Sequence, residues 1–169
     1  MIKLFTIILL PLVLSNIIHM VIVKLNYFQF LSIPLCTKLF GINKTWRGFI
    51  LVSVLNSLLC WMIYLVLKSE MVSNPLFTGF LLGVFYMLFE LPNSFLKRRV
   101  GIGSGEKANG IKSFFIILDK TDSAFGVSLI SYFLFSLSIT DFLLLFFISV
   151  IIHSFFSILL VLLRIKQSF

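Results

Sequence analysis

Two acidic residues, Asp119 and Asp122, stand three positions apart near the end of a charged segment, residues 90–123. On a helix this spacing puts both carboxylates on one face. Mg²⁺ is commonly held by one or two carboxylates together with substrate phosphates and water. The pair is therefore a candidate magnesium site. A structural reading stays open, in which Asp122 or Ser123 caps the amino end of the helix that follows.

Cations and glycines precede this pair within the same segment. The first six of them are, in order, Lys97, Arg98, Arg99, Gly101, Gly103 and Gly105. Arginine holds phosphate oxygens through two donors, and glycine lets backbone N–H groups approach an anion closely. The spacing is not that of a P-loop. Basic runs at the end of a membrane span also serve topology and anionic headgroups, so only the combination with glycines and carboxylates predicts a polyphosphate site.

Glu90 lies inside an apolar run. A charge at the centre of a membrane helix costs roughly 2.5–3.5 kcal/mol, which makes such a carboxylate a candidate functional residue. Pro92 and Asn93 follow and predict irregular backbone, which a membrane tolerates mainly beside a cavity. We expect Glu90 to join the metal ligands. The alternative is a position at the interface, paired with Lys97 or Arg98.

A second basic element, residues 41–48, reads GINKTWRG. Lys44 and Arg47 are three residues apart and could contact a phosphate from the side opposite Lys97, Arg98 and Arg99, although spacing alone does not decide this. Trp46 is more simply explained as an interfacial anchor.

Composition excludes a soluble globular protein. The 169 residues are 60% hydrophobic and 12% charged, with a mean hydropathy of +1.14, whereas soluble domains are about 25% charged. The two cysteines, Cys36 and Cys60, have no metal-ligand spacing and suggest no disulfide framework, so we interpret them as packing residues.

Five stretches approach the roughly 20 apolar residues that cross a bilayer. They are residues 4–23, 49–67, 75–96, 124–140 and 141–163, and the last two meet in a tight hairpin at 140–141. We expect an all-α integral membrane protein, a single transmembrane domain over 1–169 with about five spanning helices. Its active-site loops, 24–48 and 97–123, would line a polar cavity that faces the cytoplasm.

Charge sets the expected orientation. Twelve cations fall on one side of these spans, and only Lys3 and Lys68 on the other. The positive-inside rule then predicts a multi-pass protein of the cell membrane, with its amino terminus outside and its carboxyl terminus in the cytoplasm. Gly79 and Gly83 predict close helix packing, within the bundle or between protomers, so a homodimer stays open.

Read together, three motifs resemble the CDP-archaeol synthase family, which belongs to the wider group of CTP:phosphatidate cytidylyltransferases. The motifs are GINKTWRG, ELPNSFLKRRVGIGSGE and LDKTDS. By this resemblance Lys44, Thr45 and Arg47 match the family's K-T-x-R-G element. Its S-F-x-K-R-R element is matched by Ser94, Lys97, Arg98 and Arg99. Asp119 and Asp122 match its D-x-x-D element. The resemblance covers nearly the whole chain.

The resemblance implies an enzyme that makes a CDP-activated lipid from CTP and a membrane lipid phosphate, releases pyrophosphate and requires Mg²⁺. No nucleic-acid partner is expected. The expected catalytic cations are Lys97, Arg98 and Lys44; substrate contacts are expected from Thr45, Arg47, Ser94, Arg99, Gly101 and Gly105, and metal ligands from Asp119, Asp122 and Glu90.

Three matters stay open from sequence. The lipid can carry ester-linked acyl or ether-linked isoprenoid chains. A CTP-dependent lipid kinase would transfer the γ-phosphate to a lipid alcohol instead. A non-enzymatic membrane protein would use the basic face only to hold anionic lipids, and would then gain nothing from carboxylates placed among the cations.

Overall fold

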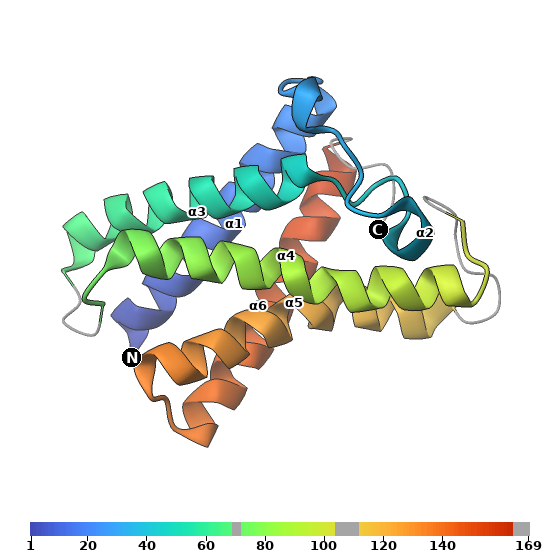
Figure 1. Cartoon of the computed structure of the whole chain (residues 1–169). Coiled ribbons are helices and arrows are strands. Elements are labelled where there is room, and N and C mark those ends of the chain that lie inside the picture. The colour runs from blue at the N-terminus through green and yellow to red at the C-terminus, as the bar shows by residue number, and fades with distance from the viewer. Residues whose placement is uncertain (69–71, 104–111, 164–169) are drawn as a thin grey trace.

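The computed structural model describes residues 1–68, 72–103 and 112–163, and within them the all-α prediction is confirmed. Two short elements, the 3-10 helix η1 (Gln29–Leu31) and α2 (Thr37–Phe40), lie in the first connection. The long helices are α1 (Ile2–Lys24), α3 (Trp46–Leu67), α4 (Pro75–Arg99), α5 (Lys112–Phe135) and α6 (Ile139–Leu162). Figure 1 shows α3 and α4 side by side, with α1 and α6 crossing them.

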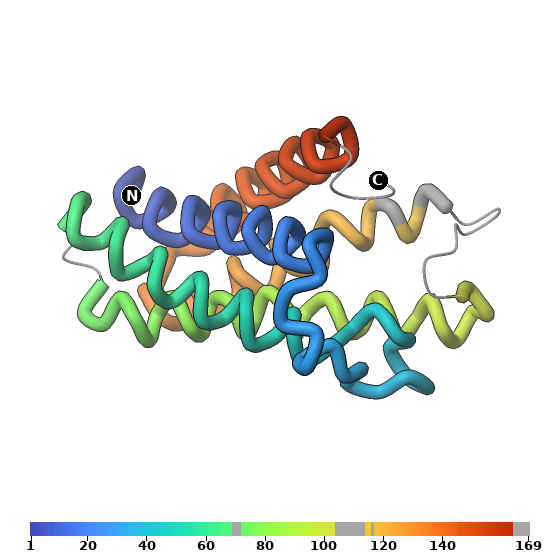
Figure 2. Tube along the Cα trace, turned by 90° about the horizontal axis from the view of Figure 1, so that it is seen from above, coloured from blue at the N-terminus to red at the C-terminus, as the bar shows by residue number. Residues whose placement is uncertain are grey.

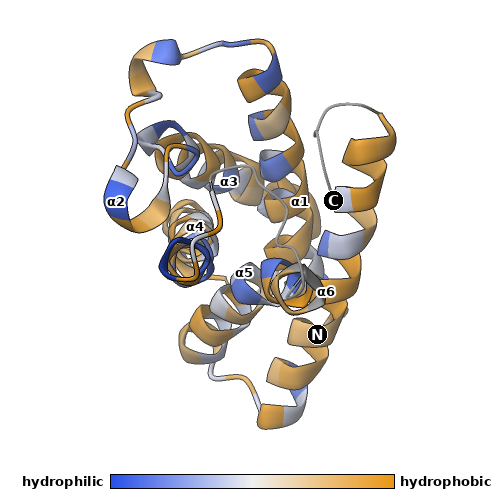
Figure 3. Cartoon of the chain, turned by 90° about the vertical axis from the view of Figure 1, so that its right-hand side faces the viewer, coloured by the Kyte–Doolittle hydropathy of each residue, from blue (hydrophilic) through white to orange (hydrophobic). Residues whose placement is uncertain are grey.

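Four helices of the described residues, α1, α3, α4 and α6, are long and apolar enough to cross a membrane. The remaining long helix, α5, has 24 residues, but its first half carries Asp119, Lys120 and Asp122. Figure 3 shows mostly hydrophobic helices, with hydrophilic residues gathered around α2 and the near end of α4. The molecule therefore has a membrane protein's surface with one polar end.

The helix boundaries differ from the expected spans. The irregular backbone expected at Pro92 and Asn93 is wrong, because α4 continues without a break from Pro75 to Arg99. The helix expected to begin at 124 begins at Lys112, so Asp119 and Asp122 lie inside α5. The alternative reading, in which Asp122 or Ser123 caps the start of this helix, is therefore excluded. The hairpin turn comes at 136–138, before α6.

Local chemistry explains several of these boundaries. The Asn74 side chain accepts the N–H of Phe77 at 3.1 Å and so caps α4, whose first residue is a proline. Ser138 caps α6 by accepting the N–H of Asp141 at 3.1 Å. At the other end of α4, Gly101 has a φ of +78°, the left-handed conformation that closes a helix and that glycine adopts without strain.

Two glycines let α3 and α4 pack closely. A Cβ on Gly79 would lie 2.6 Å from the backbone oxygen of Asn56, and one on Gly83 would lie 2.7 Å from the Cα of Ser53. The Asn56 amide also donates to the carbonyl of Gly79 at 2.6 Å. The glycine pair therefore serves packing within the chain, and it carries no argument for a homodimer.

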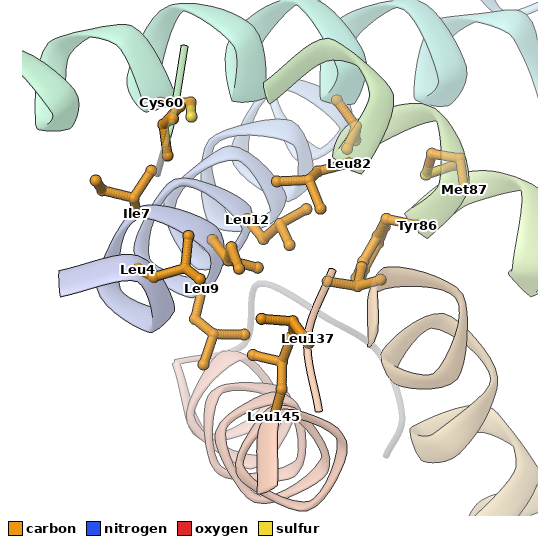
Figure 4. Close-up of a cluster of buried hydrophobic side chains, with 14 residues drawn as sticks. Leu4, Ile7, Leu9, Leu12, Cys60, Leu82, Tyr86, Met87, Leu137 and Leu145 are labelled. Atoms are coloured by element: carbon orange, nitrogen blue, oxygen red, sulfur yellow. The ribbon is translucent and has the colours of Figure 1, made fainter. Parts of the chain in front are cut away.

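The hydrophobic core occupies the half of the bundle that contains the amino terminus. Figure 4 shows side chains from α1, α3, α4 and α6 meeting there, among them Leu4, Leu12, Cys60, Leu82 and Leu145. Beyond Tyr86 and Met87 the apolar cluster ends. The second halves of α1 and α4 and the first turns of α5 continue past it, towards the end where Figure 2 shows α2 and the carboxyl end of α4.

Candidate active site

A cavity of about 660 Å³ lies at this polar end of the bundle. Its walls come from the second halves of α1 and α4, the loop before α3, the first turns of α5 and the last turns of α6. Among the described residues, three carboxylates and five cations line it: Glu90, Asp119, Asp122, Lys44, Arg47, Lys97, Arg98 and Lys120. The side of a membrane to which the cavity opens stays a prediction.

Asn93 joins the two aspartates. Its amide nitrogen donates to Asp119 Oδ1 and, at 3.2 Å, to Asp122 Oδ2. Asn93 is only 3% exposed, so this amide is fixed inside the wall of the cavity. The two carboxylates share one face of α5, as their spacing predicts, and α4 orients them.

Lys97 neutralises one of these carboxylates. Its ammonium donates to both oxygens of Asp119, each at 2.6 Å, and lies 5.8 Å from the ring centroid of Phe115. Because Lys97 follows Asn93 by four residues, both side chains point from the same face of α4 towards α5. The aspartates, the amide and the ammonium therefore form one contiguous cluster.

Glu90 lies on α4 one turn before Asn93, and it forms an ion pair with Lys44 from the loop before α3. The pairing with Lys97 or Arg98 considered from sequence is not the one observed. Burial alone would lower the pKa of Lys44, but the carboxylate of Glu90, with smaller effects from Asp122 and Asp119, raises the pKa above its ordinary value. Lys44 is therefore a cation held inside the cavity.

The described residues contain no group of three His, Cys, Asp or Glu side chains placed to hold a metal ion together. Glu90, expected as a third ligand, is paired with Lys44 in this arrangement, and its role at a metal stays a prediction. The two aspartates remain as the pair of hard oxygen ligands that Mg²⁺ accepts beside substrate phosphates.

Two arginines that line the cavity each have a buried donor with no partner among the described residues. These donors are the Nε atoms of Arg47 and Arg98. Other atoms of both guanidinium groups are held by backbone, Arg47 by the carbonyl of Tyr27 at 3.3 Å and Arg98 by that of Ile102. A buried N–H without an acceptor is costly, and a phosphate oxygen in the cavity would supply that acceptor.

The whole chain, residues 1–169, matches the family model described as CarS-like, CDP-archaeol synthase. The chain belongs to the CDP-archaeol synthase family. A CDP-archaeol synthase from Staphylothermus marinus is 34% identical over 96 residues, which are 57% of this chain and 49% of that relative. The match thus spans about half the length of the relative. No solved structure matches the chain.

The first motif of the CDP-archaeol synthase resemblance lies on one wall of the cavity. Lys44, Thr45 and Arg47 all line it, at the start of α3. The loop is held by backbone contacts, since the N–H of Leu35 donates to the carbonyl of Lys44 at 2.9 Å and that of Trp46 to the carbonyl of Ile33 at 3.0 Å. The basic side chains therefore extend from a fixed loop.

The second motif divides into residues that line the cavity and residues that do not. Ser94, Lys97 and Arg98 line it, and the Ser94 hydroxyl donates to the carbonyl of Glu90 at 3.1 Å. Arg99 instead packs over the ring of Phe95, with its guanidinium carbon 4.9 Å from the ring centroid. Arg99 is absent from the lining, because it follows Arg98 around the helix and points away.

Gly101, the first glycine after α4, has a structural explanation. The N–H of Gly101 donates to the carbonyl of Arg98 at 3.2 Å, and that of Ile102 to the carbonyl of Lys97 at 2.9 Å. These bonds close the helix, so in this conformation the Gly101 N–H is used by the protein and not offered to a phosphate. Gly105, also expected to bind substrate, lies outside the described residues.

Sequence reasoning missed two polar residues of the site. Asn93 was considered only as part of a helix break, although Glu90, Asn93 and Lys97 follow the 3- and 4-residue spacing of one helix face. Lys120 falls in the loop predicted at 97–123, yet it is 6% exposed and donates to Ser157 Oγ at 2.6 Å. A sequence prediction of a continuous α4 and of an α5 that begins near 112 would have indicated both residues.

Three further polar residues link separate helices where the cavity meets the core. The amide of Asn16 donates to the hydroxyl of Tyr86 at 3.0 Å, and His153 Nδ1 lies 3.2 Å from the same hydroxyl. All three line the cavity. They connect α1, α4 and α6 by side-chain hydrogen bonds at its inner end.

Proposed function

We propose that this protein is a Mg²⁺-dependent cytidylyltransferase of the membrane that makes a CDP-activated glycerolipid from CTP and a lipid phosphate. The observation that carries the proposal is the pair Asp119 and Asp122, held by Asn93 and surrounded by cations in one cavity. Membership of the CDP-archaeol synthase family supports the reaction class. The curated relative's name concerns archaeol; for this chain, the ester- or ether-linked lipid is left to experiment.

The cations would hold two anions that repel each other. The triphosphate of CTP and a lipid phosphate monoester must approach until their phosphorus and oxygen atoms react. Lys44, Lys97 and Arg98 would neutralise that charge as catalytic cations. Thr45 and Ser94 would contribute hydroxyl groups on the same walls. Positioning and fixed positive charge are the main sources of rate in such a site.

The reaction balances without a covalent protein intermediate. An oxygen of the lipid phosphate attacks the α-phosphorus of CTP, forming one P–O bond. The bond between that phosphorus and the oxygen that bridges to the β-phosphorus breaks, and pyrophosphate leaves with its electron pair. The chain then needs no general base, because a phosphate monoester is already ionised at neutral pH.

Mg²⁺ fits Asp119 and Asp122, whose oxygens lie within hydrogen-bonding reach of one amide nitrogen. When bound, it would screen phosphate oxygens and stabilise charge on the leaving group. Lys97 now neutralises Asp119 at 2.6 Å, and its ammonium would turn to the phosphates when the carboxylate binds a metal. Cytoplasmic placement of the cavity, with the amino terminus outside, is part of this proposal.

Substitution of the two aspartates tests the metal site. Asp119→Asn and Asp122→Asn keep the shape of the side chains and remove one charge each. We expect both to lower turnover by about 100-fold or more, since each removes an ionised ligand. Asp141→Asn is the matched control, because Asp141 lies in the first turn of α6, outside the cavity lining. Near-wild-type turnover in both site variants, with the proteins folded, would sink the metal assignment.

A further inference from the structure

Lys120 is a buried cation that the roles above do not use. It lies between Asp119 and Asp122 in sequence and is 6% exposed, and its ammonium donates to Ser157 Oγ at 2.6 Å. An ammonium inside a membrane protein is costly to bury and commonly marks a binding site. Lys120 also lines the large cavity.

The position of Lys120 differs from that of the other cations. Asp119 and Asp122 contact α4 through Asn93, whereas Lys120 contacts α6 through Ser157. Lys120 therefore places positive charge on the α6 side of the cavity. The charges of Lys97, Arg98 and Lys44 come from α4 and from the loop before α3.

A small apolar pocket, of about 40 Å³, adjoins the cavity on the same side. Its α5 and α6 walls include Ala124, Val127, Ile152 and Phe156. It shares Asn16, Tyr86 and His153 with the large cavity, so the two spaces meet at these side chains. Lys120 precedes Ala124 by one turn of α5, and the lining changes from cationic to apolar over that turn.

A cation next to an apolar pocket suits an amphiphile, whose phosphate and hydrocarbon parts are joined. CTP has no hydrocarbon part. We propose that Lys120, held by Ser157, binds the phosphate of the lipid acceptor, while the part of the lipid that follows the phosphate lies against the apolar side chains of α5 and α6 beside this small pocket. This inference rests on the proposed function, and it assigns the nucleotide to the α4 side of the cavity.

Steady-state kinetics separate the two substrates. We would measure KM for a lipid phosphate and for CTP with Lys120→Gln, Lys120→Arg and Ser157→Ala. Loss of a charge-assisted hydrogen bond to phosphate should raise the KM for the lipid on the order of tenfold or more in Lys120→Gln, with the KM for CTP unchanged. Lys120→Arg should restore part of the loss. Lys38→Gln is the control, since Lys38 is an exposed lysine on α2 outside the lining.

A binding assay keeps this inference distinct from the proposed function. Thermal unfolding in detergent would be recorded with the lipid phosphate, with the lipid alcohol that lacks the phosphate, and with inorganic phosphate. The lipid phosphate should raise the unfolding midpoint of the wild type more than either control, and this gain should vanish in Lys120→Gln. If Lys120→Gln does not fold, Ser157→Ala carries the same test, with a smaller rise in lipid KM.

The outcomes divide cleanly. Lys120-dependent binding in a protein that makes no CDP-lipid would refute the proposed function and keep the lipid-phosphate site. CDP-lipid synthesis with an unchanged lipid KM in folded Lys120→Gln would refute the site. A rise confined to the KM for CTP would assign Lys120 to the nucleotide and overturn the inference. If inorganic phosphate raises the unfolding midpoint as much as the lipid phosphate does, the site does not recognise the lipid, and the inference is also overturned.

Discussion

Replacement of Asn93 by alanine should disable the site without unfolding the protein. The amide donates to both aspartates and lies 3% exposed, so its loss leaves two carboxylates side by side without the donor that orients them. A hydrogen bond to a charged group is worth about 1.5–3 kcal/mol. If the orientation of the aspartates matters only in the transition state, loss of one such bond lowers kcat by about 10- to 100-fold.

The assay is transfer of radiolabelled CMP from CTP to a lipid phosphate by purified protein in detergent, with kcat measured at saturating substrates. Asn56→Ala is the matched control. Asn56 is also a buried asparagine whose amide donates to a partner on α4, but that partner is the carbonyl of Gly79, away from the cavity. We expect Asn56→Ala to lower the unfolding midpoint and to leave the kcat of the folded protein within about threefold, since it removes a hydrogen bond and packing between α3 and α4 away from the cavity.

The result that refutes this reasoning is specific. If folded Asn93→Ala retains kcat within twofold of the wild type, the amide does not orient catalytic carboxylates. If Asn93→Ala and Asn56→Ala lose activity only in proportion to the unfolded fraction, Asn93 is a packing residue and the cluster with Asp119 and Asp122 carries no catalytic meaning.

Two further predictions compare neighbouring residues. Arg98→Gln should lower kcat/KM by about tenfold or more, because Arg98 lines the cavity. Arg99→Gln should change kcat/KM less than about threefold, because Arg99 packs over the ring of Phe95, outside the lining. Equal losses in the two kinetic assays would contradict the assigned orientations. Gly83→Ala should destabilise the fold by about 1–3 kcal/mol, because its new Cβ would lie 2.7 Å from the Cα of Ser53. Gly48→Ala should cost less, because the atom nearest its Cβ is the flexible end of a methionine; thermal unfolding would show the opposite order if the packing of α3 on α4 were misdescribed.

Much of the fold is readable from hydropathy, and its errors have local causes. The apolar runs locate α1, α3, α4 and α6, because each is long enough to span a membrane. Pro92 misled the reading of α4: a proline inside a membrane helix removes one backbone hydrogen bond without ending the helix. The start of α5 was missed because its first turns are charged, so hydropathy marks only the apolar second half.

The candidate site was also only partly predictable from the sequence. Charge and spacing located Lys97, Asp119 and Asp122, which do meet. The partner of Glu90 could not be read from sequence, since Lys44 comes from a loop 46 residues earlier and only the packing of α3 on α4 brings it close. Burial of Lys120 depends on which face of α5 meets α6, and that required the helix to be known from its first turn.

The most direct test of the central claim is to follow label from CTP into lipid with purified protein, Mg²⁺ and a panel of lipid phosphates. The panel would hold phosphatidic acid, its diether isoprenoid counterpart and an isoprenoid monophosphate, together with a lipid alcohol as the acceptor for a kinase, and α- and γ-labelled CTP would be used in parallel. We predict that α-label enters the lipid phase with one member and that γ-label appears as pyrophosphate. Transfer of γ-label to a lipid alcohol, or no transfer and no binding of CTP, would contradict the account.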